Sequence, residues 1–181
     1  MELHSENVLP FFHIPVTEVS THELLRDALF VPKREFTSEH TIVVSPDKGG
    51  VSRSERFAQK AGLSTVHLMK HRDVSSGEVT VDGIEGDVDG KTVIIFDDII
   101  NTGATAVKTS EFVKKQGAIG VYFLATHAVF AGDSAHIIEQ SVIDQVIVTD
   151  TIAIPEEKHF SKLEVVSVSS LIADAIMKQT K

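Results

Sequence analysis

The segment 92–96, Thr-Val-Ile-Ile-Phe, most constrains the fold, because its strand-favouring residues leave no polar face. A strand with one face in water alternates polar and apolar side chains, whereas a strand inside a parallel sheet is covered on both faces and is apolar throughout. Parallel neighbours also need long crossover connections, which are usually helices. The segment therefore predicts a sheet buried between two layers of helices.

The same alternation of short apolar runs and longer amphipathic stretches continues along the chain. Strands are expected at 41–44, 65–69, 92–96, 121–126, 145–149 and 163–167, and helices at 51–61, 105–116, 133–140 and 169–178. This order predicts a three-layer α/β fold, with a mainly parallel twisted sheet and helices on both faces. A length of 181 residues fits one such domain.

Two regions fit neither a strand nor a helix by pattern. Residues 1–40, which contain Phe11-Phe12 and three prolines, are expected to be an N-terminal extension that packs on the domain. Residues 71–91 are rich in Ser, Gly and Asp, and a loop of this length is expected to be a flexible catalytic lid, with a short hairpin possible at 79–84.

Composition excludes several functions. With 17 basic and 26 acidic residues, the net charge of −9 argues against a broad nucleic-acid or anionic-membrane surface. The absence of cysteine excludes disulfides, thiolate metal sites and cysteine nucleophiles. No apolar run approaches the length of a membrane span and the first residues do not form a signal peptide, so a cytoplasmic location is expected.

The most informative chemistry follows the 92–96 strand. Two carboxylates, Asp97 and Asp98, precede a short polar loop with Gly103 and then a helix. Loop amides and a helix N-terminus suit a phosphate monoester, to which Thr102 and Thr105 add hydroxyls. The carboxylates suit ribose hydroxyls or a divalent cation. One loop can therefore hold both ends of a sugar phosphate.

This segment resembles the phosphoribosyl-binding signature of the type I phosphoribosyltransferase fold: four apolar residues, Asp-Asp, three variable residues and Thr-Gly-x-Thr. The resemblance implies that ribose 5-phosphate is bound by Asp97, Asp98, Asn101, Thr102, Gly103, Ala104 and Thr105. Asn101 stands where related synthetases usually have Asp, which removes one charge from the loop.

Other segments resemble the ribose-phosphate pyrophosphokinase (phosphoribosyl diphosphate synthetase) family. They are the Ser-Pro-Asp-x-Gly-Gly sequence at 45–50, Leu3-His4 followed by 11–16, Lys70-His71-Arg72, Gly86-Asp87-Val88, Thr126-His127 and 149–152. The resemblance runs over nearly the whole chain but covers only the C-terminal half of a full-length synthetase.

Membership of this family implies transfer of diphosphate from MgATP to ribose 5-phosphate, giving phosphoribosyl diphosphate and AMP. Lys70 and Arg72 are the expected catalytic residues. Diphosphate or ATP is expected at Asp47, Gly49, Gly50 and His4, and Mg²⁺ at His4, Asp47 and Asp97. The resemblance also implies a homo-oligomer, or a partner chain that supplies the missing N-terminal half.

Alternatives remain at this stage. A stand-alone phosphoribosyltransferase would use phosphoribosyl diphosphate and a nucleobase, and its length would fit. A non-catalytic partner or regulatory subunit would keep the sugar-phosphate site without a complete ATP site. From the residues alone, Asp47 also fits a turn before a helix, His4 a surface residue, and His127 either a ligand contact or a structural role.

Overall fold

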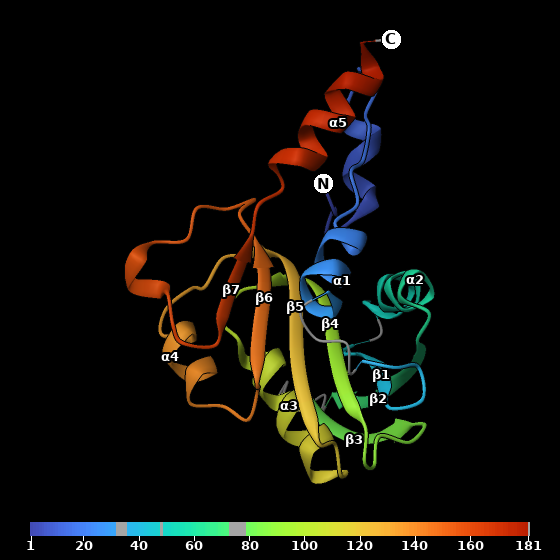
Figure 1. Ribbon diagram of the computed structural model, residues 1–181, viewed down its shortest axis with the longest axis vertical. Coiled ribbons are helices and arrows are strands. Elements are labelled where there is room, and N and C mark those ends of the chain that lie inside the picture. The colour runs from blue at the N-terminus through green and yellow to red at the C-terminus, as the bar shows by residue number, and fades with distance from the viewer. Residues whose placement is uncertain (32–35, 48, 73–78, 181) are drawn as a thin grey trace.

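The computed structural model describes residues 1–31, 36–47, 49–72 and 79–180, and shows a three-layer α/β fold (Figure 1). The sheet has seven strands in the order β3-β2-β1-β4-β5-β6-β7. All neighbours are parallel except β2 and β3, which pair as an antiparallel hairpin. The expected fold class, a mainly parallel sheet with helices on both faces, is confirmed.

The elements follow the expected order, with helix α1, strand β3 and two 3₁₀ turns in addition. The strands are β1 (Thr41–Ser45), β2 (Ser64–Arg72), β3 (Val79–Glu85), β4 (Thr92–Ile100), β5 (Gly120–Ala128), β6 (Gln145–Thr149) and β7 (Leu163–Val166). The helices are α1 (His22–Phe30), α2 (Val51–Ala61), α3 (Ala104–Lys115), α4 (Ser134–Glu139) and α5 (Ser169–Gln179), with 3₁₀ turns η1 (Glu6–Phe11) and η2 (Glu156–Lys158).

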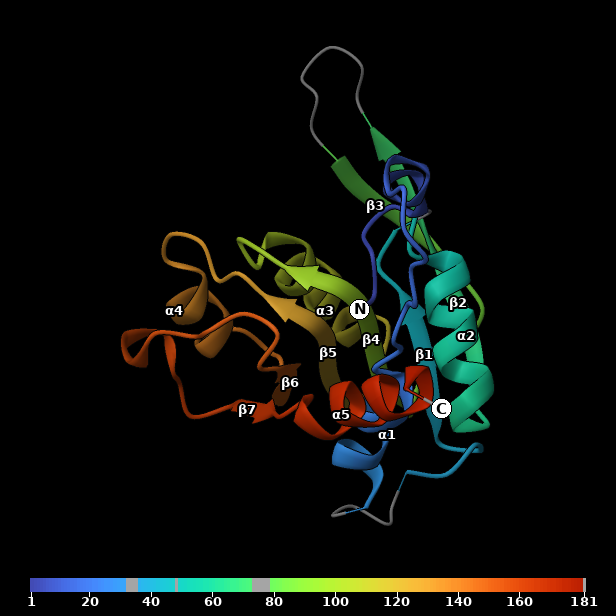
Figure 2. The same cartoon turned by 90° about the horizontal axis from the view of Figure 1, so that it is seen from above.

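The sheet separates two apolar cores. On one face, Ala106 and Val113 of α3 and Ile138 of α4 pack on strand residues such as Ile95 and Phe123. On the other face, α1 and α2 pack on alternate residues of the same strands, with Leu25, Leu29, Phe57, Phe96 and Leu124 in one cluster. Figure 2, seen from above, lets the reader follow both helical layers. Burial on both faces explains why β4 is apolar from Val93 to Phe96.

Helix α1 corrects the expectation that residues 1–40 contain no regular helix. A helix of 9 residues is marginal alone, and this one is stabilised by tertiary packing of Leu25 and Leu29, both buried. The Thr21 hydroxyl at its start shares a hydrogen bond of 2.6 Å with the Thr126 hydroxyl of β5. Part of the presumed extension therefore belongs to the core.

The hairpin considered at 79–84 is present as β3, which pairs with β2 from His67↔Glu85 to Arg72↔Val79. Within the stretch 71–91, residues 73–78 lie outside the described part of the chain. Among the described strands, β3 pairs only with β2, at the edge of the sheet, and an edge strand does not need the continuous apolar run of a central one.

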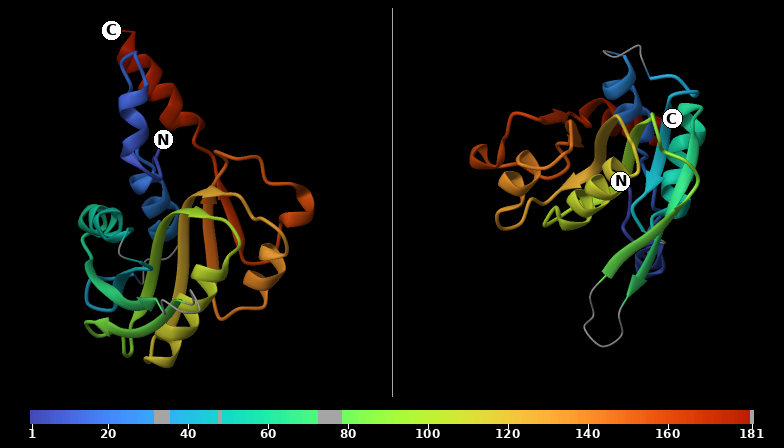
Figure 3. Two further views of the ribbon diagram at one scale, coloured as in Figure 1. Left: turned by 180° about the vertical axis from the view of Figure 1, so that it is seen from behind. Right: turned by 90° about the horizontal axis from the view of Figure 1, so that it is seen from below.

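Helix α5 projects from the domain instead of closing it. None of its residues is buried, and Figures 1 and 3 show it extending away from the sheet, on the side from which the N-terminal segment also extends. A hydrogen bond of 2.8 Å from Gln179 Nε2 to Thr17 Oγ1 joins the two segments. In the described part of the chain, no helix is both long and apolar enough to span a membrane.

Candidate functional site

Two loops meet at the carboxyl edge of the sheet. Strands β1 and β4 are parallel neighbours, with Val44 opposite Ile95. Beyond β1 the chain passes through Asp47 and the glycines into α2, and beyond β4 it passes through residues 101–103 into α3. Because ligands of open α/β sheets bind where neighbouring strands end, the two loops that the sequence singled out share one edge.

The loop between β4 and α3 forms a pocket of about 100 Å³ lined by Asp97, Ile99, Ile100, Asn101, Thr102, Gly103, Thr105, Ala106 and Phe123. Ala104 begins α3 and is exposed beside the pocket but does not line it. Gly103 has φ of 76°, and a Cβ there would lie 2.9 Å from Ile138 of α4. Glycine is therefore required both by its backbone conformation and by close packing.

This pocket suits a phosphate group. Its wall includes the first turn of α3, where backbone N–H groups have no helical acceptor and the helix dipole is positive. The Thr102 hydroxyl accepts a long hydrogen bond of 3.5 Å from the Ala104 amide, and Thr105 is exposed on the same turn. A phosphate small enough for the pocket would face amide and hydroxyl donors.

Asp97 and Asp98 lie within β4, not after it, and they differ in exposure. The Asp97 side chain keeps 14% of its accessible surface and lines the pocket, whereas the Asp98 side chain keeps 3%. Asp98 Oδ2 is 2.8 Å from His4 Nδ1 and 2.7 Å from Arg53 Nη2. Asp97 is thus the carboxylate that a ligand can reach, and Asp98 is occupied by protein partners.

Burial, together with the neighbouring carboxylates of Asp98 and Asp47, raises the pKa of Asp97 to about 7, against a hydrogen bond from the Asp98 amide that lowers it. The Arg53 guanidinium opposes this effect only partly, because it lies 3.3 Å from Asp97 and 2.7 Å from Asp98. The Asp97 end of the pocket therefore has more negative charge than Arg53 neutralises, which favours a cation or a hydroxyl donor there, whereas the start of α3 favours a phosphate.

Asp47 closes the turn that precedes α2. Its Oδ1 accepts a hydrogen bond of 2.7 Å from the Gly50 amide, and the Ser45 hydroxyl donates to its carbonyl at 2.8 Å. A Cβ on Gly49 or Gly50 would meet Asp47 Oδ1 at 3.4 Å, so the turn is compact. Asp47 accordingly has the structural role expected of a Pro-Asp turn in addition to facing the Asp97 carboxylate.

Mg²⁺ prefers carboxylate oxygens and usually keeps several waters, so one or two carboxylates suffice to hold it. Within the described residues, no three His, Asp or Glu side chains gather in a group that could hold a metal, and His4 pairs with Asp98 instead of joining Asp47 and Asp97. The partly exposed, charge-rich Asp97 fits a Mg²⁺ ion completed by water and substrate oxygens. The residues do not form an all-protein cage.

Comparison with known proteins identifies the family. Residues 77–181 match the family model described as phosphoribosyl synthetase-associated domain. The chain belongs to this family. It is 42% identical over 182 residues to a ribose-phosphate pyrophosphokinase from Thermotoga maritima and 36% identical over 178 residues to one from Synechocystis, covering 56% and 52% of these relatives. The chain thus spans about half the length of the curated relatives and matches their C-terminal half.

Solved structures agree with this relationship. The phosphoribosylpyrophosphate synthetase from Mycobacterium smegmatis superposes with a TM-score of 0.86 at 31% identity, covering 99% of this chain and 57% of that one. The structure of APRTase from Giardia lamblia superposes with a TM-score of 0.51 at 15% identity, over 81% of this chain and 78% of that one. The second likeness shows the shared fold alone.

The remaining family-derived residues have different outcomes. Lys70 and Arg72 lie on β2 opposite Val81 and Val79, and their side chains fall outside the described part of the structure. His127 is committed to the fold: its Nδ1 is 2.9 Å from the Thr151 hydroxyl, and its Nε2 is 3.0 Å from the carbonyl of Glu2. The structural interpretation of His127 therefore holds.

Arg53 is the site residue that motif reasoning missed. It lies on the first turn of α2 and its side chain keeps only 12% of its accessible surface. The available signal was its position four residues before Phe57, on the face of α2 that packs against the sheet. A cation on the buried face of an amphipathic helix needs an anionic partner, and the paired carboxylates of β4 supply it.

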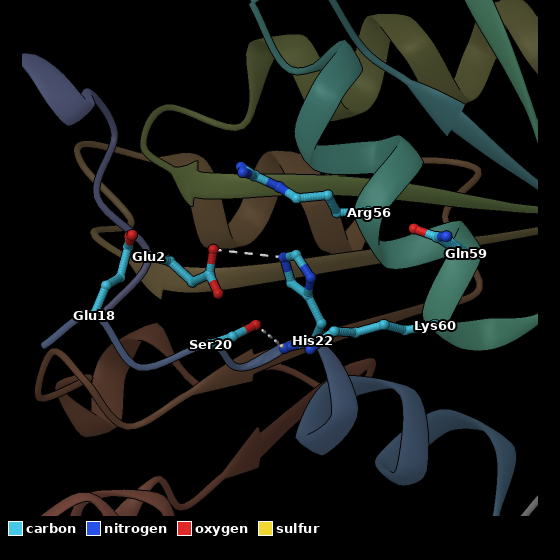
Figure 4. A pocket seen from close by; sticks show the side chains of 7 residues that line it. All are labelled: Glu2, Glu18, Ser20, His22, Arg56, Gln59 and Lys60. Carbon is cyan, nitrogen blue, oxygen red and sulfur yellow. Dashed lines mark hydrogen bonds and ion pairs between the residues drawn. The ribbon is translucent and has the colours of Figure 1, made fainter.

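A second cavity lies between α2, the start of α1 and the N-terminal residues. It has a volume of about 350 Å³ and is lined by Glu2, Glu18, Ser20, His22, Arg56, Gln59 and Lys60 (Figure 4). Glu2 is 7% exposed, and its Oε2 lies 3.5 Å from His22 Nε2. Because both acidic and basic groups line this cavity, it does not favour either an anion or a cation.

Proposed function

We propose that this chain carries the sugar-phosphate site of a ribose-phosphate pyrophosphokinase, a transferase that moves diphosphate from MgATP to ribose 5-phosphate. The observation that carries the proposal is the pocket at the start of α3, where hydrogen-bond donors suited to a phosphate lie beside the accessible carboxylate of Asp97. Identity of 42% to a named pyrophosphokinase supports this reaction. Phosphoribosyl diphosphate and AMP are the products of the proposed reaction.

In the proposed complex, the amides at the start of α3 and the hydroxyls of Thr102 and Thr105 hold the 5-phosphate. Asp97 accepts hydrogen bonds from the ribose hydroxyls and contributes to the Mg²⁺ site. The loop of Asp47, Gly49 and Gly50 faces the diphosphate of ATP. Mg²⁺, when bound, would neutralise charge on the transferring group.

The bond changes are those of an in-line phosphoryl displacement. The 1-hydroxyl oxygen of ribose 5-phosphate bonds to the β-phosphorus of ATP, the bond from that phosphorus to the oxygen bridging the α-phosphate breaks, and the hydroxyl proton goes to solvent. Lys70 and Arg72 are proposed to neutralise the charge that develops on the transferring group, as the family resemblance implies. Catalysis then depends on positioning and electrostatics, without a covalent nucleophile.

The proposed partners follow from the reaction and from length. MgATP and ribose 5-phosphate are the small-molecule partners, and the cytoplasm, where ATP is available, is the proposed location. The chain covers 56% of the Thermotoga relative, so ATP binding is proposed to need a polypeptide equivalent to the rest of that relative or further copies of this chain. Homo-oligomerisation is proposed through the exposed apolar side chains of residues 5–17 and α5.

Calorimetry with ribose 5-phosphate and Mg²⁺ is the first test. Wild-type protein is expected to bind, and the double variant Asp97→Ala, Asp98→Ala is expected to lose binding, while Lys60→Ala in the last turn of α2 retains it. A second assay supplies ATP and follows AMP by chromatography. If ribose 5-phosphate binds without AMP formation, the non-catalytic interpretation is supported. If phosphoribosyl diphosphate reacts with a nucleobase instead, the chain is a phosphoribosyltransferase.

A further inference from the structure

We propose that Arg53 is a positioning residue of this site, whose guanidinium is the counter-cation of both carboxylates. The ion pair with Asp98 is kept, whereas the ion pair with Asp97 is replaced when a ligand binds Asp97. The inference rests on the proposed sugar-phosphate site and adds a residue to it. Arg53 connects the two loops of the site: it lies in the first turn of α2, directly after the loop that follows β1, and its side chain contacts the carboxylates of β4.

The two ion pairs of Arg53 are unequal. Nη2 lies 2.7 Å from Asp98 Oδ2, in a charge-assisted hydrogen bond of normal length, and the Asp98 side chain is 3% exposed. Nη1 lies 3.3 Å from Asp97 Oδ1, beyond the usual range for such a bond, and Asp97 is 14% exposed in the pocket wall. The contact with Asp98 is therefore the anchor, and the contact with Asp97 is the one that a ligand can replace.

Neighbouring contacts fix the position of Arg53. Ser54, the next residue, donates from its hydroxyl to the Phe96 carbonyl at 3.2 Å. Both Ser54 and Phe96 are buried. Residues 96, 97 and 98 of β4 thus all contact the first turn of α2. The guanidinium is held by this docking, so it does not need a ligand to be in place.

Charge balance explains why the exchange is useful. Two adjacent carboxylates with little exposure repel one another, and one guanidinium compensates half of that charge. Without a ligand, Arg53 stabilises the pair. When a divalent cation binds Asp97, Nη1 is released from it, while Nη2 keeps Asp98 neutralised. Arg53 therefore competes with the metal for Asp97, and its positive charge favours the anionic sugar phosphate.

These two effects of one side chain have opposite signs, and this difference provides the test. Arg53→Ala is expected to bind Mn²⁺ alone about tenfold more tightly than wild type, measured by electron paramagnetic resonance. With EDTA present, the same variant is expected to bind ribose 5-phosphate about tenfold more weakly, measured by calorimetry. Arg53→Lys should fall between, and Lys60→Ala on the same helix should match wild type in both assays.

Loss of both affinities, or no change in either, would overturn the proposal, because a purely structural role predicts parallel effects. If wild type does not bind ribose 5-phosphate, the proposed function fails, while the Mn²⁺ measurement still decides the role of Arg53. If Arg53→Ala does not fold, the side-chain ¹⁵Nε resonance of Arg53 in the wild type, assigned by comparison with Arg53→Lys, replaces it. A resonance that shifts as Mg²⁺ is added supports exchange, and one that stays fixed contradicts it.

Discussion

At the scale of single residues, Asp97 and Asp98 show how one strand gives two identical side chains different tasks. Successive residues of a strand point to opposite faces of the sheet, so Asp97 lines the pocket while Asp98 contacts His4 and Arg53. Their sequence positions predicted a shared role with ribose hydroxyls. Their contacts instead separate a ligand-facing carboxylate from an anchoring one.

The raised pKa of Asp97 predicts a pH-dependent cost to the fold. Below about pH 4 both the folded and the unfolded chain hold the proton, but between 3.8 and about 7 only the folded chain does. Each rise in pH across that window therefore favours unfolding, and the full cost is present above about pH 7. Asp97→Asn should remove this cost and raise the free energy of unfolding at pH 8 by at least about 1 kcal/mol.

Urea unfolding at pH 5 and pH 8 measures this effect, with the exposed Asp133→Asn at the start of α4 as the control. The stability gain from Asp97→Asn should be larger at pH 8 than at pH 5. A gain that is equal at both values, or a loss at pH 8, would show that Arg53 fully compensates Asp97.

Gly103→Ala tests the turn that forms the pocket. Its φ of 76° is strained for alanine, and the new Cβ would meet Ile138 at 2.9 Å. Gly62→Ala is a matched control, because Gly62 has φ of 69° but nothing within 4 Å of its would-be Cβ. Gly62→Ala should cost about 1 kcal/mol of stability from strain alone, and Gly103→Ala at least about 1 kcal/mol more from overpacking.

Thermal unfolding measures both glycine variants, and calorimetry measures the affinity of Gly103→Ala for ribose 5-phosphate, which should fall. Ile138→Val removes a methylene from the clash, so it should recover part of the loss in Gly103→Ala. Equal costs at the two glycines would mean that α4 moves aside freely and does not define the pocket.

At the scale of elements, the local sequence pattern was sufficient to predict an element where its own residues carry a clear apolar or amphipathic pattern. The central strands and helices α2 and α3 follow from apolar runs, amphipathic spacing and glycine stops, and the loop at 97–105 follows from its ordered motif. Helix α1 was not expected, and strand β3 was expected only as a possible hairpin, because their stability comes from partners: Leu25 and Leu29 pack on the sheet, and β3 pairs with β2. Arg53 was missed for the same reason, since its carboxylate partners are 44 residues away or more.

The start of α1 is also fixed by the N-terminus, through Glu2. Burial alone would raise the pKa of Glu2, but hydrogen bonding and charge from His22, the Thr21 amide and Ser20 lower it to about 2. A lowered pKa in the folded chain contributes stability above the ordinary value of 4.5, and this stability is lost as pH falls toward 2. Glu2→Gln should therefore destabilise the chain by about 2 kcal/mol at pH 7.

Urea unfolding at pH 7 and pH 3 measures the contribution of Glu2 to the free energy of unfolding. The control is Glu18→Gln, because Glu18 is exposed and lines the same cavity. The difference between Glu2→Gln and wild type should shrink at pH 3, where part of the contribution has been lost. A difference that is independent of pH would mean that shape, not charge, holds Glu2 against α1.

At the scale of the whole molecule, the dominant feature is an apolar arm, which we define as residues 5–17 together with α5. Figure 3 shows both segments leaving the domain on the same side, and Figure 2 shows η1 and α5 as separate projections. Its large apolar side chains are exposed to an unusual degree: Phe11 82%, Phe12 53%, Ile14 70%, Ile176 58% and Met177 60%. A monomer rarely exposes so many large apolar groups on two short segments, so both segments of the arm are expected to be covered in the working protein.

A second copy of the chain is the occupant we expect when the chain is alone in solution. The arm contains only three charged residues at neutral pH apart from histidine, namely Glu6, Asp174 and Lys178. A nearly uncharged apolar patch is complementary to itself, and two copies related by a twofold axis would bury the same residues against each other. The fold of each domain does not depend on this contact, since the core residues lie elsewhere.

The double variant Phe11→Ser, Ile176→Ser should therefore shift the chain from a dimer or larger assembly to a monomer in sedimentation velocity, while leaving its thermal unfolding at low protein concentration unchanged. Ile119→Ser is the matched control, because Ile119 is 66% exposed but precedes β5, away from the arm. If the wild type already sediments as a monomer, the arm is instead reserved for a different polypeptide. In that case, adding a fragment equivalent to the rest of the Thermotoga relative should form a complex with wild type and not with the double variant.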